Sequence, residues 1–146
     1  MDEEDMGAEP VYELPSDQDW LLTQLVQWAE LGVNTGVTLF VNGNVVSGML
    51  SSEGVYIRRL RREFADGLGD GAVAAPIDRA FASILEGVDA LRQEEGPIPY
   101  PRYAHLTDAQ VFAPGSDPLP SKQAISLRIK IASVDSFSLG KMAQAK

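Results

Sequence analysis

The apolar residues between positions 17 and 31 recur every three or four residues, which is typical of an amphipathic helix. This stripe consists of Leu21, Leu22, Leu25, Val26, Trp28 and Ala29. Ser16 and Asp19 form a weak capping box at its start, and Gly32 is expected to end it in a left-handed conformation. We expect both tryptophans, Trp20 and Trp28, to lie in the core.

The apolar positions then change to a two-residue period over "VTLFVNGNVVSGMLSS", residues 37–52. Asn42-Gly43 supplies two residues that tolerate positive φ, as a type I′ hairpin turn requires. Gly48 interrupts the return strand, and a glycine there is typical of a bulge or a sharp bend. The following "VYIRRL", residues 55–60, is expected to add a third short strand. The hairpin therefore predicts a strongly curved sheet.

A glycine-rich connector, residues 65–75, leads to a second predicted helix. Pro76 suits a helix start, because its missing N–H has no partner there in any case. The helix carries the clearest amphipathic stripe of the chain, which consists of Ile77, Phe81, Ile84, Leu85, Val88 and Leu91. Gly96 and the proline-rich residues 97–101 are expected to stop it.

The last third of the chain returns to strand patterns. Residues 103–112 are rich in β-forming side chains, and residues 113–122 form a loop by their proline and glycine content. Between residues 125 and 131 apolar and polar positions alternate strictly, which indicates a half-buried strand. The segment "SVDS", residues 133–136, is expected to turn or bulge the chain before a last short strand at residues 137–142.

This order of elements predicts an α+β fold. It is similar to an Sm-like or SH3-type barrel, in which a small, strongly bent antiparallel sheet follows an N-terminal helix. The second helix is then an insertion. We expect residues 1–15 to form a disordered acidic arm and residues 16–146 to form a single domain.

Charge is distributed very unevenly along the 146 residues, whose net charge is −9. No lysine or arginine precedes Arg58, whereas ten acidic residues do. Such asymmetry predicts attraction within or between molecules. A plain solubilising role of the acidic arm stays open as the alternative.

The chain contains no cysteine, which excludes disulfides and thiolate metal sites. Its acidic start is the opposite of a signal peptide, and its apolar runs are far shorter than the ~20 residues of a membrane helix. We expect a cytoplasmic protein that does not enter the membrane.

Candidate catalytic groups are scarce. His105 is the single histidine, and without a cysteine or second histidine it is interpreted as structural rather than as a zinc ligand. Asp135 lies in the expected turn and is interpreted as a cap for neighbouring backbone N–H groups. "GLGDG", residues 67–71, lacks the spacing and the lysine of a phosphate loop. We therefore predict no enzyme, no cofactor and no metal.

The arginine cluster at residues 58–62 is the feature that indicates nucleic acid, because small barrels of this kind often assemble into RNA-binding rings. The sequence pI of about 4.5 counts against this function, since RNA readers usually combine a basic surface with exposed aromatic side chains. An Sm-like RNA-binding module is the alternative function, and a small unidentified enzyme ranks third.

Three segments together resemble the gas vesicle protein U family, the accessory proteins encoded with gas vesicle shell proteins in bacteria. They are "VNGNVVSGML" (residues 41–50), "AHLTDAQVF" (104–112), and "PSK" with "IKIASVDSFSLGKM" (120–122 and 129–142). The order and spacing of these segments are similar to the family's. Ser136 departs from the pattern, since a glycine is expected there.

The resemblance implies a non-catalytic accessory protein that acts by protein–protein interaction in vesicle assembly or clustering. Its expected partners are the shell protein or other gas vesicle proteins, at the vesicle surface, and we also expect it to form a homo-oligomer. The residues predicted for these contacts are Arg58, Arg59, Arg61, Arg62, Asp135, Phe137 and Lys141.

Overall fold

The computed structural model describes residues 13–93 and 99–142, so nearly all of the predicted acidic arm lies outside the described residues. Its helices are α1 (Trp20–Glu30), α2 (Glu53–Leu68) and α3 (Ala74–Gln93). Its strands are β1 (Gly36–Val41), β2 (Asn44–Ser51), β3 (Tyr103–Phe112), β4 (Ile125–Lys130) and β5 (Val134–Leu139), with a 3₁₀ turn at Ile131–Ser133 between the last two. In this described part no helix is both long and apolar enough to span a bilayer.

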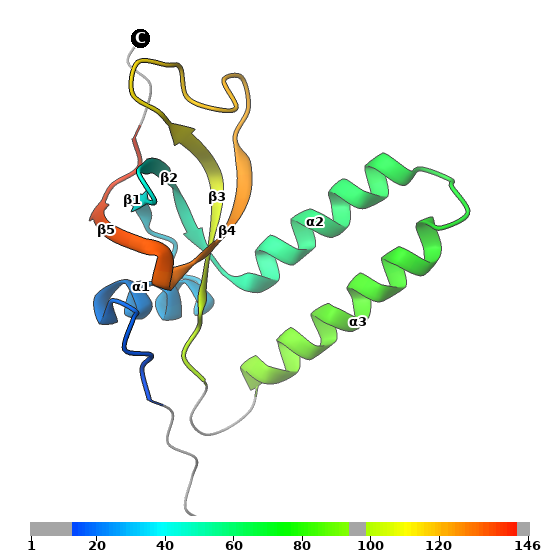
Figure 1. Cartoon of the computed structure of the whole chain (residues 1–146). Coiled ribbons are helices and arrows are strands. Elements are labelled where there is room, and N and C mark those ends of the chain that lie inside the picture. Colours follow the sequence, from blue (N-terminus) through cyan, green and yellow to red (C-terminus); the bar gives the residue numbers. More distant parts are fainter. Residues whose placement is uncertain (1–12, 94–98, 143–146) are drawn as a thin grey trace, which may run out of the picture.

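The five strands form one antiparallel sheet in the order β4-β3-β2-β1-β5, which confirms the α+β class. The 3₁₀ turn carries the chain from one edge of the sheet to the other (Figure 1). The two edge strands, β4 and β5, are not hydrogen-bonded to each other in the described structure. Among the described residues the sheet is therefore not closed into a barrel, so the predicted Sm-like or SH3-type barrel is not confirmed.

The β1–β2 hairpin and its irregular return strand are confirmed. Asn42 and Gly43 have φ values of 50° and 83°, as a type I′ turn requires. The register between β2 and β3 shifts next to Gly48. A Cβ added to Gly48 would lie 2.9 Å from the carbonyl oxygen of Thr107 and 3.1 Å from Cβ of Ala109. Position 48 in the bulge therefore requires glycine, because the neighbouring strand β3 leaves no room for a side chain.

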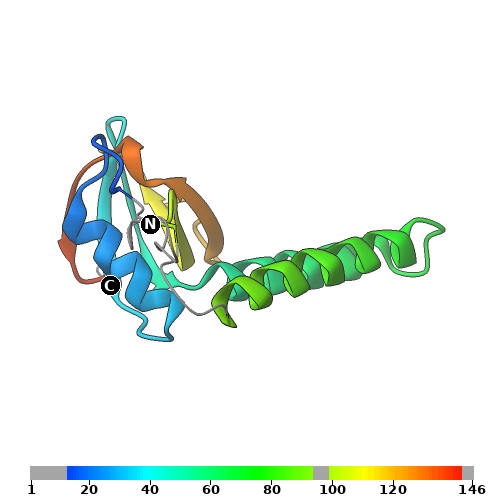
Figure 2. The same ribbon diagram turned by 90° about the horizontal axis from the view of Figure 1, so that it is seen from below.

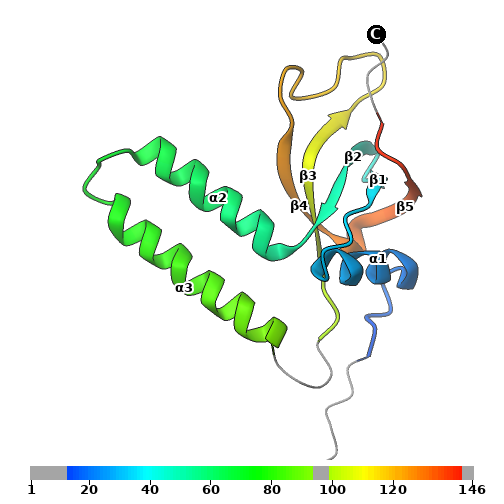
Figure 3. The same cartoon turned by 180° about the vertical axis from the view of Figure 1, so that it is seen from behind.

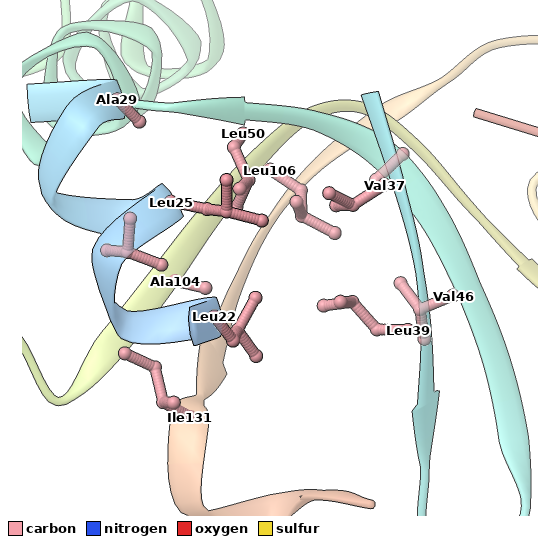
Figure 4. Packing of buried hydrophobic residues seen from close by; sticks show 12 residues of the cluster. Leu22, Leu25, Ala29, Val37, Leu39, Val46, Leu50, Ala104, Leu106 and Ile131 are labelled. Carbon is pink, nitrogen blue, oxygen red and sulfur yellow. The ribbon is translucent and has the colours of Figure 1, made fainter. Parts of the chain in front are cut away.

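The core lies between α1 and the concave side of the sheet. In Figure 4, Leu22, Leu25 and Ala29 of α1 point toward strand residues such as Leu39 and Leu106. The full set of buried apolar residues in this cluster is Leu22, Leu25, Val26, Ala29, Val37, Leu39, Val46, Leu50, Ala104, Leu106, Ala109 and Ile131. This continuous apolar core accounts for the position of α1 across one end of the sheet (Figure 3).

The ends of α1 and its outer face differ in part from the prediction. Gly32 ends the helix with φ 94° as predicted. The cap at the start is Asp19, whose Oδ2 accepts a hydrogen bond from the Leu22 N–H at 2.7 Å. Trp20 and Trp28 are 67% and 43% exposed, so their assignment to the core was wrong. The predicted apolar stripe of this helix was too wide, because the sheet covers only the part of the α1 surface around Leu22.

The prediction of a strand at residues 55–60 was wrong, because this segment is the first part of α2. Val55, Tyr56 and Ile57 favour strands by local propensity. The Oγ of Ser52 accepts a hydrogen bond from the Val55 N–H at 3.2 Å and so caps a helix instead. Tertiary packing against α3 then decides the conformation, as it often does for a weak local preference.

The insertion between β2 and β3 is therefore a hairpin of two helices rather than a strand and one helix. Helices α2 and α3 lie side by side, and the predicted glycine-rich connector forms only the tip of their hairpin. Figures 1 and 2 show this helical hairpin projecting away from the sheet. Along it the rings of Phe64 and Phe81 are 5.4 Å apart. The protein thus has a body, formed by α1 and the sheet, and a projecting helical hairpin.

Candidate protein-binding site

The predicted arginine cluster of α2 is divided between two faces of the helix. Arg58 and Arg61 point to α3, where the Nη2 of Arg58 is 3.2 Å from Asp89. Arg61 donates from Nε and Nη2 to the two carboxylate oxygens of Asp78, at 2.7 and 2.8 Å. This bidentate bond holds the pKa of Asp78 below its ordinary value. These two arginines therefore join the helices of the hairpin and are already paired.

The other two arginines, Arg59 and Arg62, face the sheet. Together with Glu63 they line a depression of about 260 Å³, whose opposite wall is formed by residues 123–126 at the start of β4. Arginines three residues apart lie on one side of a helix, which explains why this pair separates from Arg58 and Arg61. We call this depression the α2–β4 groove.

The α2–β4 groove has the chemistry of a site for an acidic peptide. Guanidinium groups bind carboxylates with paired, charge-assisted hydrogen bonds. Strand β4 is an edge strand, and the free backbone groups of an edge can pair with an extended segment of another chain. Farther along β4, Arg128 stacks on the ring of Tyr103 at 4.4 Å, and Lys130 is exposed. The edge therefore combines positive charge with backbone donors and acceptors.

The remaining predicted contact residues, Asp135, Phe137 and Lys141, lie at the opposite edge of the sheet, on β5 or just after it. The structure does not bring them together with the arginines. Asp135 is exposed within β5, at the point where the register with β1 shifts. The bulge predicted for residues 133–136 is therefore confirmed, and the turn precedes it at Ile131–Ser133. Phe137 packs against the core, which leaves less of its ring for a partner.

His105 lies in β3 beneath the start of α2 and is only 2% exposed. Its ring is 5.0 Å from that of Tyr56, and its Nε2 is 3.9 Å from a carboxylate oxygen of Glu53. Neither ring nitrogen has a hydrogen-bond partner among the described residues. Burial, reinforced by the charge of Arg128, lowers the pKa of His105 to about 4. A neutral, enclosed imidazole fits the predicted structural role.

Within the described residues there is no group of three or more histidine, aspartate and glutamate side chains placed to hold a metal ion. Sequence reasoning missed Glu63 and residues 123–126 as parts of the α2–β4 groove. The local sequence feature that could have indicated them is the neighbouring basic residue Lys122. The groove itself forms only when α2 is a helix packed beside β4.

Comparison with protein-family models adds the decisive observation. A model described as gas vesicle protein GvpU-like matches residues 19–142. This chain belongs to the GvpU-like family. The match covers the body and the helical hairpin alike, and it confirms the resemblance found in the sequence. No curated protein and no solved structure matches the chain.

Membership of the GvpU-like family makes this a protein associated with gas vesicles. The matched range includes every residue of the α2–β4 groove and also the β5 edge. It begins at Asp19, the N-cap of α1, so the acidic residues 2–9 lie outside it.

Proposed function

We propose that this GvpU-like protein is a non-catalytic accessory protein that binds other gas vesicle proteins during vesicle assembly or clustering. The observation that carries the proposal is the family match over residues 19–142. The α2–β4 groove supports a binding role, because it offers two guanidinium groups beside an edge strand. The expected partner segment is extended and acidic.

The uneven charge of the chain supports an electrostatic contribution. Five acidic residues lie within residues 1–9, and the structure has basic side chains on both α2 and β4. We propose that this protein self-associates on the vesicle and that several weak contacts add up to firm attachment on its repetitive surface. Screening by salt should then weaken clustering, because exposed charges interact over only about 10 Å at 0.1 M salt.

The proposal is tested by adding purified protein to gas vesicles and measuring how much protein floats with them. Replacing both Arg59 and Arg62 by alanine should weaken attachment by at least about a hundredfold, since each charge-assisted hydrogen bond contributes about 1.5–3 kcal/mol and each ~1.4 kcal/mol is a factor of ten in Kd. The matched control, alanine at Arg58 and Arg61, removes the same charge from the paired face and should retain attachment. Equal loss in both variants would show that only net charge matters.

Clustering is measured on the same vesicles by light scattering. Deleting residues 1–15, or raising the salt concentration, should reduce it. Clustering unchanged by both treatments would contradict the electrostatic contribution. Wild-type protein that stays off the vesicles and is instead retained on mixed RNA at low salt would overturn the proposal in favour of the RNA-binding alternative.

A further inference from the structure

The face of α3 away from the bidentate Arg61–Asp78 pair carries no charged residue over about five turns. Its seam follows an alternating three- and four-residue spacing, as in helices that pack along one another. The seam consists of Val73, just before α3, and Ile77, Ala80, Ile84, Gly87 and Leu91. Ile84 and Leu91 are 49% and 45% exposed. The neighbouring Ser83 and Ala90 are small and exposed too. We call this surface the α3 outer face.

Gly87 indicates what the α3 outer face accommodates. A glycine inside a helix costs about 1 kcal/mol relative to alanine. A Cβ added at Gly87 meets no atom within 4 Å, so no described part of this chain requires a glycine there. Small residues on an open helix face allow the backbone of another helix to approach closely, and Ala80, Ser83 and Ala90 add to the same flat strip.

We propose that the α3 outer face pairs with the α3 outer face of a second copy. The two helices run antiparallel, related by a two-fold axis at the level of Ala82 along α3. In this register Ile84 meets Ala80 of the second copy, and Ile77 meets Gly87 of the second copy. Each large side chain therefore lies opposite a small one, which is the condition for close packing. Leu91 meets Val73 of the second copy, so the contact extends to the tip of the hairpin.

Charge complementarity favours a second copy over another occupant. Arg79 and Glu86 are exposed on one flank of the α3 outer face, and neither forms an ion pair with a described residue. The antiparallel register brings Arg79 level with Glu86 of the second copy to within one residue, about 1.5 Å along the axis. The two-fold axis creates this pair twice. Because Ser83 and Ala90 are small, the longer side chains can reach across them.

The shape of the molecule permits this pairing. The hairpin projects clear of the body (Figures 1 and 2), so two antiparallel hairpins would place the two bodies at opposite ends. The 20 residues of α3 span about 30 Å. Such a dimer would present two α2–β4 grooves pointing apart. This step extends the proposed function, and its test needs no vesicles, so the two can fail separately.

The mass of the purified full chain is measured by size-exclusion chromatography with light scattering over a concentration series. The wild type should approach twice 15.8 kDa as concentration rises. Gly87→Leu should be monomeric, because the added side chain fills the space that the second helix needs. It should keep a native circular dichroism spectrum, since that space is open within its own chain. A wild type that stays monomeric throughout, or a Gly87→Leu variant that still dimerises, would overturn the inference.

A charge exchange tests the register. Arg79→Glu places like charges together twice across the axis and should raise the dimer Kd about tenfold. Combining Arg79→Glu with Glu86→Arg restores both pairs and should restore the wild-type Kd. If the double variant dimerises no better than Arg79→Glu alone, this register is wrong.

Discussion

At Gly48 the backbone of β3 occupies the place where a side chain would stand. Replacing Gly48 by alanine should lower the free energy of unfolding by about 1–3 kcal/mol, because backbone atoms must move to admit the methyl group. Gly67→Ala is the matched control. Its Cβ meets nothing within 4 Å, so better helix propensity should raise stability by up to about 1 kcal/mol. Urea denaturation measures both, and loss of stability in both variants would contradict this account.

His105 should make stability depend on pH. Its pKa of about 4 lies below the ordinary 6.5, so the unfolded chain takes up the proton first as pH falls. Stability should therefore be full above about pH 6.5 and decrease by at most about 3 kcal/mol on the way to pH 4. His105→Phe should remove this contribution.

The measurement is the difference in unfolding free energy between wild type and His105→Phe at pH 7 and at pH 5. Taking the difference matters because burial raises the pKa of Glu30, which acts in the opposite direction and is common to both proteins. The same pH dependence in both would show that His105 contributes nothing.

At the scale of elements, the helical hairpin depends on how α2 starts. Ser52→Ala removes the side-chain acceptor of the Val55 N–H and should destabilise the protein by about 1 kcal/mol, as lost N-caps do. Ser52→Thr keeps a hydroxyl and should lose much less. Thermal unfolding followed at 222 nm compares the two, and equal losses would assign the effect to packing of Ser52 rather than to the cap.

The start of α2 also shows why the sequence pattern did not predict a helix there. A strand of six residues and the first turns of a helix have similar local sequence patterns when β-branched and aromatic residues come first, as they do at residues 55–57. The helix at residues 77–91 was predictable because its stripe repeats over four turns. Strand β3 was predicted with its correct bounds, since proline-containing segments delimit it on both sides.

At the scale of the whole molecule, the two proposed contacts lie on different parts, one beside the body and one on the hairpin. The α2–β4 groove lies where the hairpin joins the sheet, and the α3 outer face runs along the projecting hairpin (Figure 2). A partner in the groove therefore need not obstruct a second copy on α3. A protein with two such independent surfaces can link neighbours on a repetitive assembly, as the proposed function requires.

The sequence by itself determined the features that depend on near neighbours: the Asn42-Gly43 turn, the bulge at Gly48, the apolar stripes of α1 and α3, and the family segments in the second half. Local backbone preference and periodicity depend on residues close together in the sequence, so these features could be predicted from the sequence directly. Only the tertiary structure decided that residues 55–60 are helical, that the tryptophans are exposed, and which arginines of α2 pair with α3. Each of these depends on segments distant in the chain packing together, and packing against α3 and β4 outweighs the small free energies of local preference.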